Sequence, residues 1–172
     1  GIPADSVRAV ESTIGTTGNA RVAQEYIESH KEELGDVSTV EIMTNDYHML
    51  RAWIIFSLQM LRDTASKELA VTEEDKEQIK SLLREGLNAE GDAYPAMMKE
   101  TREQVMEILK EYFKESKIRV KPLVAEEVLE KDGDAARARY AEQLRKSKMV
   151  RATLVYEYGG IRDLLDGKYK VR

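Results

Sequence analysis

Apolar residues recur every three or four positions along most of the chain, which is the pattern of amphipathic helices. The period is most regular between residues 94 and 112, where we expect one helix. Similar patterns predict helices before Gly15, over residues 19–34, from about 46 to 70, from Thr72 to Leu87, over 123–131 and over roughly 134–157. The sequence therefore predicts an all-α fold, a helical bundle of about five to seven helices.

Several residues mark where these helices are expected to begin. Thr72 is a suitable N-cap, and Pro95 lies near a helix start, where its missing N–H costs nothing. Ser38 followed by Glu41 fits a capping box, and Thr44-Asn45-Asp46 offers a second cap a few residues later. The helix that follows should therefore begin near one of these two positions.

Glycines mark the expected turns and helix ends. Gly15-Thr16-Thr17-Gly18 predicts a turn between two helices, because the strand and the lysine of a phosphate-binding loop are both missing around it. Lys131-Asp132-Gly133-Asp134 predicts a helix end followed by a new N-cap. Gly159-Gly160 is expected to end the last long helix, although residues 152–158 have a strand-like composition. Residues 118–122, which end in Pro122, should be extended or a turn.

The segment from Trp53 to Phe56 departs from the amphipathic pattern, because its apolar residues follow one another without a polar position. A helix that is apolar on nearly every face is surrounded by other elements. We therefore expect the helix at 46–70 to be the central, buried helix of the bundle. No membrane span is predicted, since Arg51 and Arg62 enclose a run far shorter than the ~20 apolar residues that a span needs.

Composition agrees with a single soluble helical domain over residues 1–172. Charged residues make up 34% of the chain, which suits helices with highly charged outer faces. The absence of cysteine excludes disulfides, thiolate metal sites and cysteine nucleophiles. The few Asn and Gln beside many Glu, Lys and Arg are typical of hyperthermophile proteins, and helical mesophile proteins share the Glu and Lys bias. No stretch resembles a signal peptide, and both a cytoplasmic and a virion location are compatible with the sequence.

Charge is distributed unevenly along the chain. Residues 119–172 form a basic C-terminal helical segment with 13 Lys and Arg and 9 Asp and Glu, a charge of +4, whereas residues 1–118 form an acidic bundle with a charge of −9. Basic side chains neutralise phosphates and tyrosine rings stack on bases, so this segment is a candidate nucleic-acid-binding surface, and a solvated helix face is the alternative. The candidate contacts are Arg137, Arg139, Tyr140, Arg145, Lys146, Lys148 and Arg151, with Tyr156 and Tyr158 as further stacking candidates.

An acidic stripe complements the basic segment. Glutamates recur every four residues on one helix face, where like charges repel one another unless lysines lie nearby. We expect this stripe to be either an ordinary exposed face or a self-association surface that meets a basic surface of the same chain or of another copy. Its members are Glu103, Glu107, Glu111 and Glu115.

Catalytic and metal sites find little support in the sequence. A di-iron bundle needs Glu-x-x-His pairs, but the residues three before His30 and His48 are Ile27 and Asn45. A zinc site lacks both cysteine and enough histidine. We expect His48 to be a hydrogen-bonded structural histidine and His30 to be exposed, with no cofactor and no metal.

Three function classes follow from these observations. The leading hypothesis is a non-enzymatic, self-assembling structural protein, a homo-oligomer that organises nucleic acid as a coat or nucleoid protein does. The alternative is a small helical adaptor or regulatory subunit that docks a protein partner. A third possibility is a metal-dependent enzyme built on the stripe glutamates.

Overall fold

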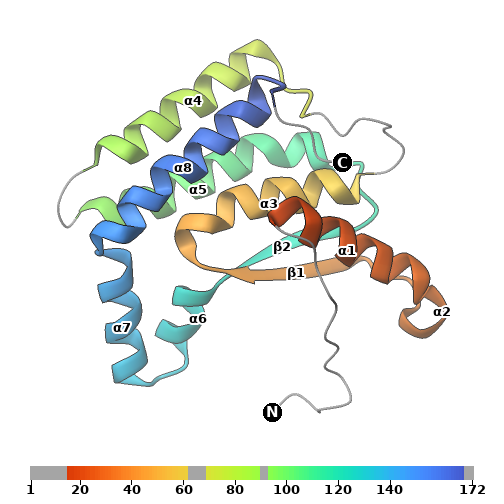
Figure 1. Ribbon diagram of the computed structural model, residues 1–172, viewed down its shortest axis with the longest axis horizontal. Coiled ribbons are helices and arrows are strands. Elements are labelled where there is room, and N and C mark those ends of the chain that lie inside the picture. The colour runs from red at the N-terminus through yellow and green to blue at the C-terminus, as the bar shows by residue number, and fades with distance from the viewer. Residues whose placement is uncertain (1–14, 62–68, 90–92, 169–172) are drawn as a thin grey trace.

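The computed structural model describes residues 15–61, 69–89 and 93–168, which form helices packed around one central helix (Figure 1). The predicted all-α bundle is confirmed, because the described residues are mostly helical and contain one short two-stranded sheet. The elements in chain order are α1 (Thr16–Ser29), α2 (Lys31–Leu34), β1 (Thr39–Thr44), α3 (Asp46–Met60), α4 (Glu73–Asn88), α5 (Tyr94–Lys110), the 3-10 turn η3 (Glu111–Phe113), β2 (Arg119–Val124), α6 (Ala125–Lys131), α7 (Ala135–Arg145) and α8 (Lys148–Leu165).

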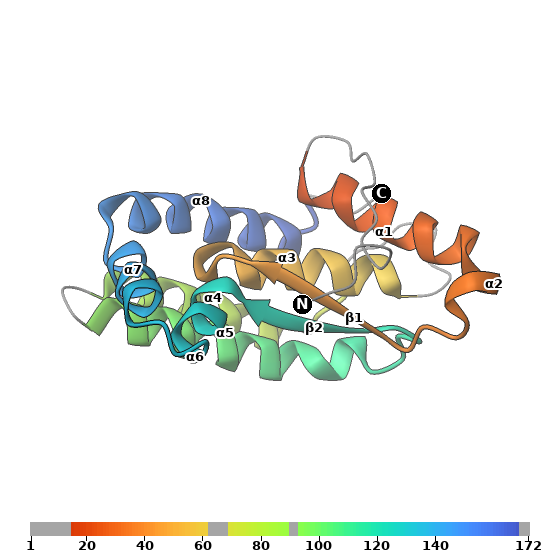
Figure 2. The same cartoon turned by 90° about the horizontal axis from the view of Figure 1, so that it is seen from below.

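Helix α3 is the central helix that the sequence predicted. Eleven of its 15 residues are buried, and it packs against α1, α5, α8 and both strands. Figure 2 shows α8 and α5 on opposite sides of α3. The core between these helices is apolar and contains Met49, Ile54, Ile55, Leu58, Ile79, Leu83, Met98, Leu109, Leu154, Ile161 and Leu164. In the part of the chain that is described, no helix has the length and apolar character needed to cross a bilayer.

The two strands correct the prediction of a helix start at Ser38. Residues 39–44 form β1, which pairs in parallel with β2 from Thr39 opposite Arg119 to Thr44 opposite Val124. The β-branched residues of β1 favour this conformation, but its partner lies about 80 positions further along the chain. The extended conformation expected at 118–122 is therefore one strand of a sheet.

The basic C-terminal segment contains two helices where one was predicted over 134–157. The Ser147 hydroxyl accepts a hydrogen bond from the backbone N–H of Val150 at 3.2 Å, and this cap starts a new helix. The prediction that Gly159-Gly160 ends the helix was wrong, because α8 continues to Leu165. At Gly160 a Cβ would lie 2.9 Å from Nε of Arg51 on α3, so the Arg51 side chain occupies the space beside this glycine.

Other helix boundaries also differ from the prediction. Helix α3 ends at Met60, well before residue 70, and residues 62–68 lie outside the described part. The expected turn at 15–18 is the start of α1, with Gly15 as its N-cap at φ 98°. A break at His30 separates α1 from α2, so the described residues contain eight α-helices. The helix expected before Gly15 lies outside the described residues.

Candidate functional site

Helix α7 lies at the edge of the bundle and exposes most of its surface. It begins as the sequence predicted, because Gly133 takes a positive φ of 83° and the Asp134 carboxylate accepts hydrogen bonds from the backbone N–H groups of Ala136 and Arg137. It packs mainly against α6, with which it projects from the bundle (Figure 1). Among its residues Ala141 is buried, and the others are exposed or half-buried.

Most of the predicted nucleic-acid contacts lie on the outside of α7 and the first turns of α8. Arg139 and Lys148 are exposed and form no ion pair with another described residue. Arg137 pairs with Asp132 at 2.7 Å, and Lys146 pairs with Glu142 at 2.9 Å. We call the following exposed residues the α7–α8 surface: Arg137, Arg139, Tyr140, Lys146, Lys148, Met149, Arg151, Val155 and Tyr156.

The aromatic side chains of this region divide into exposed and buried rings. Tyr140 is 59% exposed and Tyr156 is 80% exposed, so both rings are accessible to a partner. Tyr158 is 2% exposed and belongs to the core, which contradicts its suggested role in stacking. Arg151 lies over the ring of Tyr94, 5.5 Å from its centroid, and keeps an exposed side chain.

Arg145 faces the interior and does not belong to the α7–α8 surface. Its side chain is 13% exposed, and its guanidinium contacts Asp46 at 3.3 Å and also pairs with Glu130. A glutamate at this position would face the buried carboxylate of Asp46. Charge reversal at Arg145 is therefore expected to destabilise the fold, and it is unsuitable as a test of nucleic-acid binding.

Arg145 is part of a buried charge cluster at the N-terminus of α3. The carboxylate of Asp46 pairs with both Arg102 and Arg145, and Arg102 also donates to Glu127 at 2.6 Å. The carboxylate of Glu126 accepts a hydrogen bond from the backbone N–H of Asp46 at 2.9 Å. Burial raises the pKa of Asp46, and the two guanidinium groups partly oppose this shift. No sequence pattern indicated this cluster, because its members come from four distant segments.

The acidic stripe is exposed, and three of its glutamates pair with lysines of the same segment. Lys99 lies 3.9 Å from Glu103, Lys114 lies 3.2 Å from Glu111, and Lys110 pairs with Glu107. The face is less regular than predicted, because α5 ends at Lys110 and the chain tightens into η3. Within the described ranges no ion pair joins Glu103, Glu107, Glu111 or Glu115 to α7 or α8.

His48 connects three helices through polar contacts. Its Nε2 lies 3.2 Å from the Thr16 hydroxyl of α1, and its Nδ1 lies 2.8 Å from the carboxylate of Glu157 on α8. Arg51 lies 3.5 Å from the same carboxylate oxygen, so an arginine shares this acid with the imidazole. The contacts fit the expected structural histidine, which here joins α1 and α8 to α3.

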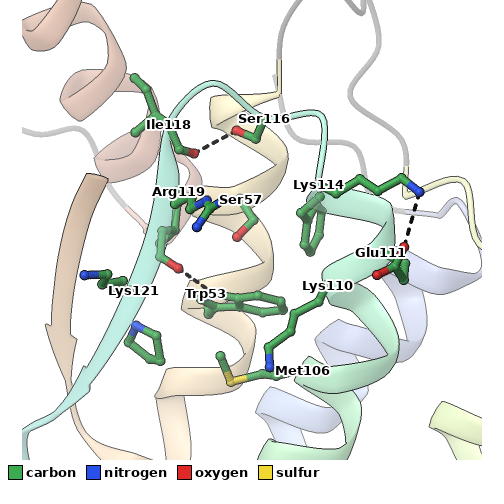
Figure 3. Close-up of a pocket in the computed structure, with 13 residues that line it drawn as sticks. Trp53, Ser57, Met106, Lys110, Glu111, Lys114, Ser116, Ile118, Arg119 and Lys121 are labelled. Carbon is green, nitrogen blue, oxygen red and sulfur yellow. Dashed lines mark hydrogen bonds and ion pairs between the residues drawn. The ribbon is translucent and has the colours of Figure 1, made fainter. Parts of the chain in front are cut away.

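A cavity of about 440 Å³ opens between α3, the end of α5 and β2 (Figure 3). Trp53 and Phe113 form part of its apolar wall, with ring centroids 5.2 Å apart in an edge-to-face arrangement. Arg119 and Lys121 line its β2 side. The cavity could not be predicted from the sequence, because its walls come from segments that are far apart in the chain.

Neither metal clusters nor known relatives add to this geometry. Among the described residues, no group of three or more His, Cys, Asp or Glu side chains is placed to hold a metal ion. No protein-family model matches the chain, and no curated protein and no solved structure matches it. Function is therefore inferred from the geometry of this chain alone.

Proposed function

We propose that this chain is a non-enzymatic structural protein that binds and organises nucleic acid through the α7–α8 surface and associates with further copies of itself. The main support is that exposed large hydrophobic side chains and exposed cations lie together on α7 and α8. Of the six large hydrophobic side chains that are exposed in the described residues, four lie on α7 and α8. They are Tyr140, Met149, Val155 and Tyr156, and they lie on the same two helices as the exposed cations.

This combination suits a polyanion that carries aromatic bases. Arg139 and Lys148 have no carboxylate partner among the described residues, so contact with phosphates would cost them no existing ion pair. Phosphate contacts release condensed counterions, which favours binding at low salt. The exposed ring of Tyr140 can stack on an unpaired base, and such stacking contributes roughly 1–3 kcal/mol per base.

The first test is fluorescence anisotropy with labelled single-stranded and duplex DNA over a range of salt concentrations. The double variant Arg139→Glu/Lys148→Glu should bind at least about tenfold more weakly, which corresponds to 1.4 kcal/mol. Its plot of log affinity against log salt should also be shallower, by roughly 0.7–0.9 for each phosphate that the variant no longer neutralises. The matched control is Lys31→Glu/Lys117→Glu, which changes the net charge equally at exposed residues on neither α7 nor α8.

Two results would contradict the proposal. One is an affinity that both double variants lower equally, since only net charge would then matter. The other is an absence of binding to either DNA at low salt. Tyr140→Ala provides a further distinction, because it should weaken binding to single strands more than binding to duplex DNA.

A protein-docking adaptor is the second candidate, and the outer face of α8 favours it. Met149, Val155 and Tyr156 are 64%, 51% and 80% exposed, which is unusual for large apolar side chains on one helix. Size-exclusion chromatography with light scattering on natively purified protein separates the two candidates. A complex with a high 260/280 nm absorbance ratio that nuclease or high salt disperses would support nucleic-acid binding. A protein-like absorbance ratio would support the adaptor if the complex resists nuclease and if the variant Val155→Ser/Tyr156→Ser does not form it.

A further inference from the structure

The cavity between α3, α5 and β2 has the size and the wall of a small-molecule site. Its volume of about 440 Å³ lies within the range of roughly 300–1,000 Å³ that is usual for ligand pockets. It lies apart from the α7–α8 surface, because its walls come from α3, α5, η3 and the segment 116–122. Ligand binding in this cavity is therefore independent of the α7–α8 surface.

The wall of the cavity is apolar and held in place. The indole N–H of Trp53 donates a hydrogen bond to the backbone carbonyl of Val120 at 2.9 Å, which fixes the ring against β2. Phe113 meets that ring at an interplanar angle of 81°. Met106 extends the apolar lining (Figure 3). A wall made of aromatic and flexible sulfur-containing side chains suits a planar apolar group.

Most charged side chains around the cavity are basic, and only some of them already have an acidic partner. The two lysines on the α5 side already have partners, since Lys110 pairs with Glu107 and Lys114 extends toward Glu111 (Figure 3). On the β2 side, Arg119 and Lys121 are exposed and form no ion pair with a described residue. The lining thus offers two unpaired cations, and a guanidinium can bind a carboxylate through two parallel hydrogen bonds.

We propose that this cavity binds a small amphipathic organic anion. Its apolar, preferably aromatic, body lies against Trp53, Phe113 and Met106. Its acidic group lies at the β2 side, where the Arg119 guanidinium neutralises it and Lys121, whose side chain extends toward the β1 side of the strand, adds positive charge at the rim (Figure 3). Both parts are needed, because the apolar wall alone does not select an anion and the two exposed cations alone do not enclose a ligand.

Trp53 provides a direct readout, because it is the one tryptophan of the chain and lies in the cavity wall. The probe is 8-anilinonaphthalene-1-sulfonate, and N-phenyl-1-naphthylamine is its uncharged analogue with the same ring system. The full-length folded protein is titrated with each probe, and energy transfer from tryptophan to the bound probe is recorded. We expect saturable binding of one sulfonate probe per chain, with transfer from Trp53, and clearly weaker binding of the uncharged analogue.

Variants separate the charge from the apolar wall. Arg119→Gln/Lys121→Gln should weaken binding of the sulfonate probe by roughly ten- to a hundredfold, the range expected when charge-assisted hydrogen bonds are removed. Binding of the uncharged analogue should be unchanged, which also shows that the variant is folded. The control Lys117→Gln/Arg84→Gln removes the same charge from exposed residues outside the cavity lining and should bind both probes as the unaltered protein does.

Three outcomes would overturn the proposal. The first is equal affinity for both probes. The second is an equal effect of the two double variants on the sulfonate probe. The third is probe binding that shows no energy transfer from Trp53 and that is lost in the variant Val155→Ser/Tyr156→Ser. The probe would then lie on the apolar face of α8.

Discussion

At the scale of single residues, the polar side chains in the core depend on one another. Asp46 is 4% exposed and Arg102 is 5% exposed, and an isolated charge at such depth would cost several kcal/mol. Asp46 contacts two arginines, and Arg102 contacts two carboxylates, so each buried charge has more than one counter-charge. These residues therefore act as a set that determines where α7 and α5 meet the start of α3.

Two buried tyrosines next to this set predict how stability depends on pH. Burial raises the pKa of Tyr94 to about 12, and burial also raises the pKa of Tyr158 well above the ordinary value of 10. Above pH 10 the unfolded chain loses these protons while the folded chain keeps them. The free energy of unfolding should therefore fall as the pH rises from about 10 to 12, by at most about 1.4 kcal/mol per pH unit for each tyrosine.

Chemical denaturation between pH 8 and 12 measures this slope. Tyr94→Phe and Tyr158→Phe should each flatten it, because phenylalanine has no proton to lose. Tyr156→Phe is the control, since the ring of Tyr156 is 80% exposed. An equally steep alkaline decline in the Tyr94→Phe/Tyr158→Phe double variant would show that other groups cause it.

At the scale of elements, glycine allows α4 and α5 to approach closely. Gly86 of α4 faces α5, and a Cβ at this position would lie 2.6 Å from the Thr101 hydroxyl oxygen and 3.3 Å from its Cβ. Gly159 also lies inside a helix, but a Cβ there would meet nothing closer than the end of the Arg162 side chain at 3.8 Å. Gly86 and Gly159 therefore have the same helix propensity, but only Gly86 is closely packed against a neighbouring helix.

We predict opposite effects of alanine at these two positions. Gly159→Ala should stabilise the protein by up to about 1 kcal/mol, the difference in helix propensity between alanine and glycine. Gly86→Ala should destabilise it by about 1–3 kcal/mol, because the methyl group overlaps Thr101 and the two helices must separate. Denaturant unfolding measures both changes, and Thr101→Ala should restore part of the stability that Gly86→Ala removes. Equal stabilisation by both substitutions would contradict the close packing of α4 and α5.

At the scale of the whole molecule, the acidic stripe and the exposed cations lie on different elements. The acidic stripe lies along α5 and η3, and exposed cations lie on α7 and the start of α8. Figure 2 shows α5 and α8 separated by α3, and in the described part of the chain no ion pair joins the two charged faces. A contact between them would therefore join two copies head to tail, and such contacts build rings or filaments.

This arrangement predicts self-association that depends on protein concentration and weakens with salt. Glu103→Lys/Glu107→Lys should shift the protein toward the monomer, because it places cations opposite the basic face of the next copy. The matched control is Glu77→Lys/Glu85→Lys on α4, where both glutamates are also exposed. Light scattering over a range of protein concentrations measures the change. A monomer at every concentration would mean that the acidic stripe is an ordinary solvated face.

Features that depend on neighbouring residues could be predicted from the sequence. The caps at Thr72 and Asp134, the glycine stop at Gly133 and the helix start at Pro95 all lie where the pattern placed them. The burial of α3 on nearly every face also followed from its continuous apolar run. Such features involve residues within about four positions, so a single sequence contains the information that determines them.

Features that depend on distant residues were decided by the tertiary structure. The N-cap residue Asn45 makes no side-chain cap, and the start of α3 is capped by Glu126 from α6, 80 positions away. Tertiary contacts also pair β1 with β2, turn Arg145 inward to Asp46 and assemble the cavity around Trp53. In each case the groups that pair or pack together meet only in the folded chain, so the sequence around each of them contains no sign of its partner. Local periodicity therefore predicts the helices, whereas long-range packing decides which polar and aromatic side chains remain available to a partner.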